Sequence, residues 1–217
     1  MIDIIPAIIP TSAAHLLETA QMLRFAPRVQ IDVVDGVFAS PASWPYNQGD
    51  IDITAAATVC EQFEVQVDIM ALNPVAAITA WAAAGAKEVV VHLETVATLD
   101  EVIGVCATHN IRLWLSGYDT VPVTEYIKHQ ADIYGVQLMG IHTIGRQGQP
   151  LSDRVLDTIT QLRAAAPTLP ILIDGSVNED TIEALHRAGA SAFVVGSAIS
   201  KAADPRQAYQ SLCQKVN

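Results

Sequence analysis

The chain is short of basic residues and of cysteine. Its 12 lysines and arginines face 23 aspartates and glutamates, which gives a formal net charge of −11. Nucleic-acid backbones and anionic membrane surfaces both attract basic patches, so neither partner is expected. The three widely spaced cysteines, Cys60, Cys106 and Cys213, argue against a disulfide framework or a thiolate metal site and fit a reducing cytoplasm. Neither a signal peptide nor an apolar run of membrane-spanning length is found, so a soluble cytoplasmic protein is expected.

The residues that are present favour a compact fold. The chain has 217 residues, of which 51% are hydrophobic and 16% charged, and this composition is typical of one globular domain covering residues 1–217. Short β-branched runs alternate about eight times with alanine-rich amphipathic stretches. The expected strands are Ile2–Pro10, Val29–Val34, Val65–Met70, Glu88–Leu93, Ile111–Leu115, Ile133–Ile141, Ile171–Asp174 and Ala192–Val195. The expected helices are Ser12–Phe25, Ile53–Phe63, Pro74–Ala84, Leu99–His109, Val123–Gln130, Ser152–Ala166, Glu179–Ala188 and Pro205–Val216.

This alternation predicts a single-domain α/β protein with the (β/α)8 TIM-barrel fold. Strands rich in Val, Ile and Leu and separated by helices are typical of a parallel sheet that is covered by helices. A doubly wound open sheet is the alternative, but the usual glycine fingerprint after the first strand is missing. The longest irregular stretch, Asp35–Asp50, follows the second strand, and its length suggests a functional lid.

Three of the expected strands carry an aspartate near their C-terminal end: Asp32, Asp68 and Asp174. Burying an ionised carboxylate costs several kcal/mol unless another group compensates for the lost water. Parallel barrels keep their chemistry at the C-terminal ends of their strands. We therefore expect the three acids to share one site.

Glycine-bearing loops follow the last three expected strands. Glycines at strand ends let backbone N–H groups approach a ligand, and a short helix beginning near Gly196 would direct its positive end at a phosphate. Barrels commonly hold phosphate after strands seven and eight, although the same glycines also suit ordinary turns. The predicted phosphate-binding residues are Gly145, Arg146, Gly148, Gly175, Ser176, Gly196 and Ser197.

With these motifs in place, the chain resembles the ribulose-phosphate 3-epimerase family of (β/α)8 barrels along nearly its whole length. The resemblance lies in the segments IIPAIIPTS, VQIDVVDGVF, VQVDIMALNP, VVVHLE, QLMGI, GRQGQPL, LIDGSVNEDT and VVGSAIS. The family pairs two aspartates as acid and base on opposite faces of a sugar carbon. The resemblance places these catalytic roles on Asp32 and Asp174.

The resemblance also implies a divalent metal site, but with altered ligands. The family binds its metal through the two aspartates and two histidines, and the histidine positions here are Gln30 and Asp68. The implied set is therefore Gln30, Asp32, Asp68 and Asp174. These ligands are all oxygens, which favours Mg²⁺ or Mn²⁺ over Zn²⁺. With no metal, at least one of the crowded carboxyls should keep a proton. Asp68 then has three other roles open to it, as a proton donor, as an acid that binds a hydroxyl, or as a structural hydrogen-bonding residue.

Further residues are expected around the substrate. In the family's motifs a serine is replaced by Ala7 and a methionine by Val34, while Met70 and Met139 are retained. His92 and Glu94 also fit the family's fourth-strand pattern, although a histidine within a strand is often a core residue. His142 follows the sixth strand, near the expected ligand. The predicted substrate-pocket residues are Ala7, Met70, His92, Met139 and His142.

The leading functional hypothesis is an epimerase of a phosphorylated ketose that transfers protons between Asp32 and Asp174 through an enediolate. One alternative is a barrel that binds a sugar phosphate without catalysis, because both histidine ligands are replaced. Another is a decarboxylase or aldolase-like lyase, because related phosphate-binding barrels resemble this chain. Those barrels carry an Asp-x-Lys-x-x-Asp motif after the third strand, however, and the stretch that begins here at Asp68 has no lysine. The family's members are often oligomeric, so a homo-oligomer is expected.

Overall fold

The computed structural model describes residues 2–48, 53–142, 144 and 149–217. Eight parallel strands follow one another in chain order around a closed barrel. The strands are β1 (Asp3–Ile8), β2 (Arg28–Val34), β3 (Glu64–Met70), β4 (Glu88–His92), β5 (Arg112–Ser116), β6 (Gly135–Met139), β7 (Ile171–Asp174) and β8 (Ala192–Val195). The predicted (β/α)8 fold class is confirmed.

A helix follows each strand, as the sequence pattern predicts. The helices are α1 (Ala13–Met22), α2 (Thr54–Cys60), α3 (Val75–Ala84), α4 (Leu99–His109), α5 (Val123–Ile127), α6 (Val155–Ala165), α7 (Ile182–Ala188), α8 (Ser197–Ser200) and α9 (Pro205–Val216). Two short 3-10 turns are η1 (Tyr46–Gln48) and η2 (Leu93–Thr95). Several helices are shorter than expected. Helix α3 ends at Ala84 and is followed by Gly85, whose φ of 104° suits a residue without a side chain. No helix in the described part of the chain is both long and apolar enough to cross a membrane.

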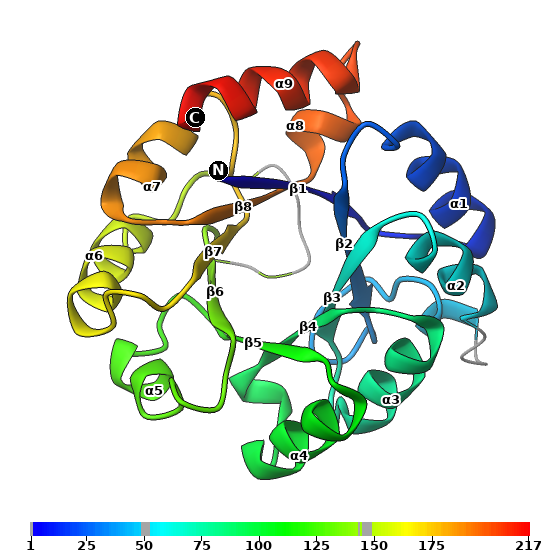
Figure 1. Ribbon diagram of the computed structural model, residues 1–217, viewed down its shortest axis with the longest axis horizontal. Helices are drawn as coiled ribbons and strands as arrows, with labels where there is room; N and C mark the ends of the chain where they lie inside the picture. The colour runs from blue at the N-terminus through cyan, green and yellow to red at the C-terminus, as the bar shows by residue number, and fades with distance from the viewer. Residues whose placement is uncertain (1, 49–52, 143, 145–148) are drawn as a thin grey trace. The chain divides into compact units, whose positions relative to one another are not determined.

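The chain forms two compact units, and each is described by itself. The N-terminal unit comprises residues 7–113, and the C-terminal unit comprises residues 1–6 and 114–217. In the N-terminal unit, α1 to α4 stand on the outer side of β2, β3 and β4 (Figure 1). In the C-terminal unit, α5, α6, α7 and α9 stand outside β6, β7 and β8 in the same way (Figure 1). The prediction of one domain stays a prediction.

Strands β2, β3 and β4 alternate between apolar and polar residues. Successive side chains of a strand point to opposite faces, so the segments VQIDVV, VQVDIM and EVVVH each divide into two sets. One set is valine and isoleucine, and the other holds Gln30 and Asp32 on β2, Gln66 and Asp68 on β3, and Glu88 and His92 on β4. Both sets are buried. The polar face therefore has to satisfy its own hydrogen bonds, and it does so partly by contacts between neighbouring strands.

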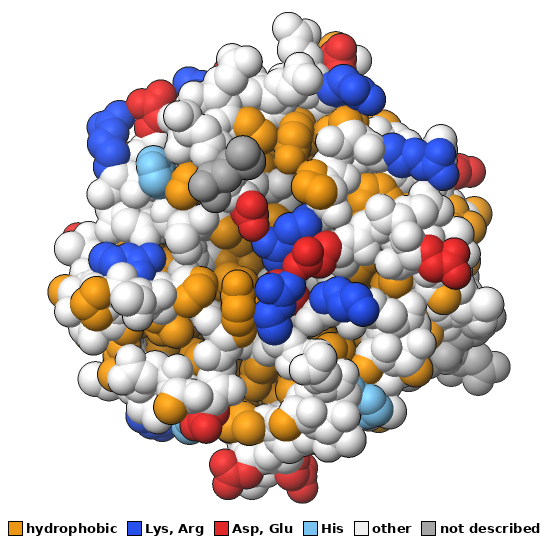
Figure 2. Space-filling model, viewed as in Figure 1, with side chains coloured by type: hydrophobic (Ala, Val, Ile, Leu, Met, Phe, Trp, Pro, Cys, Tyr) orange, Lys and Arg blue, Asp and Glu red, His pale blue; other side chains and the backbone are white. Residues whose placement is uncertain are grey.

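A network of ion pairs joins the first residues of β2, β3, β4 and β5. Glu88, with a side chain only 1% exposed, pairs with Arg28 at 2.9 Å and with Arg112 at 2.6 Å. The same carboxylate accepts a 3.0 Å hydrogen bond from Gln66, and Glu64 also pairs with Arg112. Figure 2 shows oppositely charged side chains next to one another on the face that it draws. These contacts lie at the N-terminal ends of the strands, whereas the predicted site lies at the C-terminal ends. Barrels place residues that stabilise the fold at the N-terminal ends.

The irregular segment after β2 is held firmly over its described part, residues 35–48. The Ser43 N–H donates to the Val34 carbonyl, and the Ser43 hydroxyl accepts from the Val34 N–H at 2.9 Å. Trp44 is only 1% exposed and meets Trp81 of α3 edge-on, with ring centroids 6.2 Å apart. Its backbone N–H donates to the carbonyl of Pro10. The segment is therefore fixed to both β2 and α3, while residues 49 and 50 of the predicted lid lie outside the described residues.

Candidate active site

Asp32 and Asp68 occupy matching positions on neighbouring strands of the N-terminal unit. They are partners in the parallel register of β2 and β3, and their exposed fractions are 6% and 0%. The side chains of register partners on one face lie close together. Two adjacent buried carboxylates repel one another and lose hydration, so they need donors or a cation nearby.

Each of these acids has a polar neighbour on its own or the next strand. The Gln30 Nε2 donates to Asp32 Oδ1 at 2.8 Å, and the His92 Nε2 lies 2.9 Å from Asp68 Oδ1. Gln30 and His92 are both 0% exposed. Ala7 pairs in register with Gln30, and Met70 pairs with Val34 at the end of β3. The N-terminal unit thus brings together six of the predicted site residues: Ala7, Gln30, Asp32, Asp68, Met70 and His92.

Asp174 ends β7 in the C-terminal unit and is partly exposed. Its register partner on β6 is Met139, and the Gln137 Nε2 lies 3.4 Å from its Oδ2. The Gly140 N–H donates to the Asp174 carbonyl at 2.6 Å. A Cβ on Gly140 would lie 2.1 Å from the Gly175 carbonyl oxygen, so only glycine allows this approach of the β6 and β7 loops.

The predicted phosphate-binding residues fall in two groups. Gly175 and Ser176 follow β7 with φ values of 98° and 55°, and the Ser176 hydroxyl donates to the Gln149 carbonyl. A positive φ is uncommon for a serine. Gly196 follows β8 and Ser197 begins α8. The others, Gly145, Arg146 and Gly148, lie outside the described residues.

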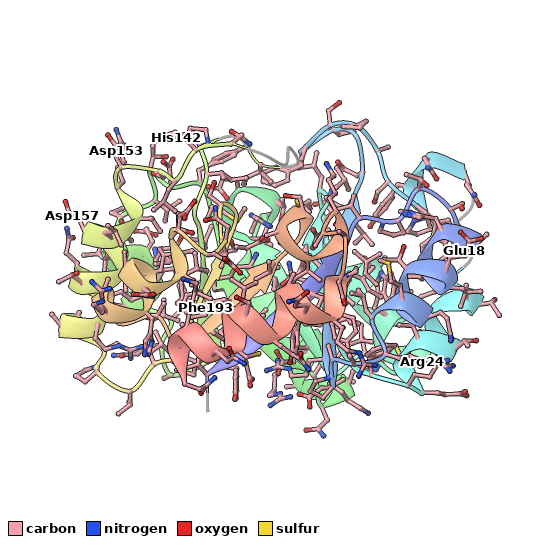
Figure 3. The ribbon with its side chains drawn as sticks, turned by 90° about the horizontal axis from the view of Figure 1, so that it is seen from above. Glu18, Arg24, His142, Asp153, Asp157 and Phe193 are labelled. Atoms are coloured by element: carbon pink, nitrogen blue, oxygen red, sulfur yellow. The ribbon has the colours of Figure 1, made fainter. Side chains whose placement is uncertain are left out.

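His142 is the most exposed predicted pocket residue, with 52% of its side chain accessible. Its Nδ1 lies 2.6 Å from Asp119 Oδ2, in the loop after β5. Its Nε2 lies 4.0 Å from Asp153 Oδ1, and Figure 3 shows the two labelled residues close together at one end of this unit. Asp119, at 8% exposure, also accepts a 2.8 Å hydrogen bond from the Ser152 hydroxyl.

Three polar residues of this unit were missed by the sequence analysis. They are Gln137, which contacts Asp174, Asp119, which holds His142, and Ser116 at the end of β5. The Ser116 hydroxyl is buried without a hydrogen-bond partner among the described residues, and such a group often faces a water or ligand. Only their positions in apolar strands could have revealed Gln137, in the middle of β6, and Ser116, the last residue of β5. Asp119 lies in a loop and gave no signal.

The fold and these strand ends define a class of protein: (β/α)8 barrels with carboxylates and glycine loops at the C-terminal ends of their strands. Within that class, the model of the "Ribulose-phosphate 3 epimerase family" matches residues 3–200. The chain belongs to this family, as the resemblance in its motifs predicted.

Relatives with assigned names agree with the family match. A ribulose-phosphate 3-epimerase of Mycobacterium leprae is 28% identical over 222 residues, which cover 98% of this chain and 94% of the relative. The ribulose-phosphate 3-epimerase of Bacillus subtilis is also 28% identical, with 98% of each chain covered.

Solved structures show the same fold at lower identity. A 3-hexulose-6-phosphate synthase superimposes with a TM-score of 0.74 at 20% identity, with both chains covered completely. A 3-keto-L-gulonate-6-phosphate decarboxylase from Vibrio cholerae gives a TM-score of 0.73 at 15% identity, covering 100% of this chain and 98% of that one. These likenesses support the barrel fold alone.

Proposed function

We propose that this protein is an epimerase of a phosphorylated ketose, with Asp32 and Asp174 exchanging the roles of acid and base. The observation that carries the proposal is the presence of a carboxylate at the C-terminal end of both β2 and β7 in a member of the ribulose-phosphate 3-epimerase family. Relatives named ribulose-phosphate 3-epimerase make a pentulose 5-phosphate the first substrate to test.

The proposed reaction needs little beyond two well-placed carboxylates. One carboxylate removes the proton from the carbon next to the ketone, and the electron pair moves into an enediolate. The other carboxyl group then returns a proton to the opposite face, which inverts the configuration of that carbon. Gln30 assists by holding Asp32 at 2.8 Å, and Gln137 lies beside Asp174 at 3.4 Å. The short Gln30 contact orients Asp32, and Gln137 adds a weaker contact at Asp174.

The loops after β7 and β8 support a phosphate-binding role for Gly175, Ser176, Gly196 and Ser197. Consecutive positive φ values at Gly175 and Ser176 turn backbone N–H groups out of the regular strand pattern, which makes them available to an anion. The hydroxyl of Ser197 adds a further donor, whereas the Ser176 hydroxyl already donates to the Gln149 carbonyl. Gly145, Arg146 and Gly148 are proposed to complete this site.

A divalent cation is a proposed partner of the acids. Asp32 and Asp68 are adjacent and buried. Their carboxylate oxygens are the kind of ligand that suits Mg²⁺ or Mn²⁺. We propose that Asp174 joins them in one metal-holding group, with Gln30 as a fourth ligand. The cation would neutralise the negative charge that develops on the enediolate oxygens. A reaction without metal remains the alternative.

The proposal is tested by following proton exchange. Ribulose 5-phosphate is incubated with the protein in deuterated solvent, with Mn²⁺, with Mg²⁺ and with chelator, and NMR records the C3 hydrogen. Deuterium should enter at C3 and the epimer should accumulate. Asp157→Asn, a change on the exposed side of α6, is the control that keeps full activity. Absence of exchange with every pentulose and hexulose phosphate tried would reject the epimerase function.

The main alternative is a sugar-phosphate-binding protein without catalysis. It is favoured by the presence of Gln30 and Asp68 where the family resemblance expects histidine ligands. Calorimetry separates the two, because tight binding of a ketose phosphate without exchange supports the binding protein. A lyase is the third reading, and release of a one-carbon or two-carbon product would identify it. The cytoplasmic location, the homo-oligomeric state and the absence of nucleic-acid and membrane partners stay predictions.

A further inference from the structure

The pair formed by Asp68 and His92 is completely enclosed. Both side chains are 0% exposed, and the Nε2 of His92 lies 2.9 Å from Oδ1 of Asp68. When Asp68 is a carboxylate, its oxygen accepts and the imidazole Nε2 donates. A hydrogen bond to a buried carboxylate offsets part of the cost of its burial, so His92 stabilises Asp68 beside Asp32.

The same bond also fixes the direction of the Asp68 carboxylate. The side chain of aspartate has two rotatable bonds, and a contact at Oδ1 determines the plane of the group and hence the direction of Oδ2. Val90 on β4 is the register partner of Asp68, and His92 lies two residues further along the same strand face. The donor is therefore placed by a rigid strand, which is the most reliable support for a functional side chain.

His92 is held in turn by the segment that follows β2. The ring of Phe38 lies against the imidazole, with centroids 5.2 Å apart and planes tilted by 51°. Asp35 fixes this segment, because its Oδ1 accepts from the backbone N–H groups of Val37 and Phe38 at 2.7 and 2.8 Å. Its Oδ2 accepts from the Leu72 N–H at 2.9 Å, just beyond β3. The contacts run from Asp35 through Phe38 and His92 to Asp68.

We propose that His92 is a positioning residue for the epimerase reaction, acting through Asp68 and supported by Phe38. This inference rests on the proposed function. His92 contacts Asp68 and acts on the reaction only through that carboxylate, without touching the substrate itself. Asp68 is the residue that meets the substrate oxygens or their cation. Loss of a residue that orients another functional side chain in this way typically lowers activity 10- to 100-fold.

The test is a double-mutant cycle with His92→Leu, Asp68→Asn and the double variant. His92→Leu should lower kcat about 10- to 100-fold and change KM for ribulose 5-phosphate much less. His92→Gln, which keeps an N–H donor of similar reach, should recover most of the lost kcat. In the Asp68→Asn background, His92→Leu should add little further loss, because the residue acts only through Asp68.

Thermal unfolding shows whether each variant is folded before its kinetics are compared. The NMR signal of the His92 Nε2–H proton gives a readout that does not need activity. This proton should have the chemical shift of a hydrogen-bonded group in the parent protein, and its chemical shift should change in Asp68→Asn. Equal kcat losses from His92→Leu in both backgrounds, or no rescue by His92→Gln, would overturn the inference. An inactive parent protein would instead reject the proposed function, and an unshifted imidazole signal would then reject the inference separately.

Discussion

Asp119 and His142 join two loops of the C-terminal unit, with Oδ2 of the aspartate 2.6 Å from Nδ1 of the histidine. Asp119 follows β5, and His142 lies just after β6. The same Oδ2 accepts a hydrogen bond from Ser152, near the start of α6. One largely buried carboxylate therefore holds both ends of the β6–α6 connection, which contains part of the predicted phosphate-binding set.

Removing this carboxylate should loosen the connection. Asp119→Ala leaves the hydroxyl of Ser152, a buried residue, and the Nδ1 of His142 without their acceptor, so we expect a loss of about 2 kcal/mol in the free energy of unfolding. KM for the ketose phosphate should rise more than kcat falls. Urea denaturation and steady-state kinetics measure both effects. Asp153→Ala is the matched control. The Asp153 side chain is 88% exposed, and its Oδ1 lies 4.0 Å from the His142 Nε2, which is too long for a hydrogen bond. Equal stability of the two variants would contradict this role.

The ion pairs at the beginnings of the strands should contribute to stability without affecting catalysis. Glu88→Ala removes the buried carboxylate that Arg28 and Arg112 share. Both arginines are partly exposed and keep Glu64 as a partner, so we expect a loss of about 1–3 kcal/mol in the free energy of unfolding. The control is Glu183→Ala, which removes an exposed partner of Arg187 and should leave the denaturation midpoint unchanged. Glu88→Ala protein that is still folded should keep its KM. A large change in KM for that variant would contradict the claim that the N-terminal ends of the strands contribute to stability alone.

The fold was predictable because its signals are repeated along the chain. β-Branched runs and alanine-rich stretches alternate regularly, and β7 and β8 have the predicted bounds. Helix ends were less accurate: α5 ends at Ile127 rather than Gln130, and α6 begins at Val155 rather than Ser152. Ser152 is drawn out of the helix because its hydroxyl binds Asp119 and its N–H donates to Gly140. Such tertiary contacts leave no periodic pattern in the sequence.

The candidate site was predictable only where it lies on strands. Asp32 and Asp68 were found because a carboxylate inside an apolar run is unusual, and their shared register confirms that they are neighbours. The partner of His92 could not be read from the chain, because residues 68 and 92 are 24 positions apart and meet only when β3 pairs with β4. Asp119 was missed for a similar reason.

The thiols should react slowly at neutral pH. Burial raises the pKa of Cys60 to about 11, although Lys87 opposes the shift, and burial raises the pKa of Cys106 to about 12. At pH 8 the thiolate fraction, and with it the alkylation rate, should be roughly a hundredfold lower for Cys60 and roughly a thousandfold lower for Cys106 than for a free cysteine. Iodoacetamide labelling of folded and urea-unfolded protein measures the difference. Equal labelling rates would contradict the burial of both residues.

The same shifts predict how stability depends on alkaline pH. The folded pKa values lie above the ordinary thiol value of 9.0, so the unfolded chain releases these protons at a lower pH than the folded protein does. The stabilising contribution is therefore complete below about pH 9 and is lost as pH rises towards 11 and 12. The melting temperature should fall across this range. An unchanged melting temperature between about pH 8.5 and 10.5 would argue against this linkage.

Single substitutions of Asp32 and Asp174, the two proposed acid–base residues, should affect the two epimers differently. If each carboxylate serves one face of the substrate, Asp32→Asn removes the base for one epimer and leaves Asp174 able to deprotonate the other. Each single variant should then incorporate solvent deuterium into only one of the two epimers, and the two variants should act on opposite ones. Net epimerisation should fall at least about 100-fold in both.

This asymmetry is measured by supplying each C3 epimer of the pentulose 5-phosphate separately and following its C3 hydrogen by NMR. Asp157→Asn, on the exposed face of α6 (Figure 3), should exchange and epimerise both substrates like the parent protein. Exchange of the same epimer by both aspartate variants would contradict the assignment of one carboxylate to each face of the carbon. Either both carboxylates would then reach the same face, or a group other than these two aspartates would remove the proton there.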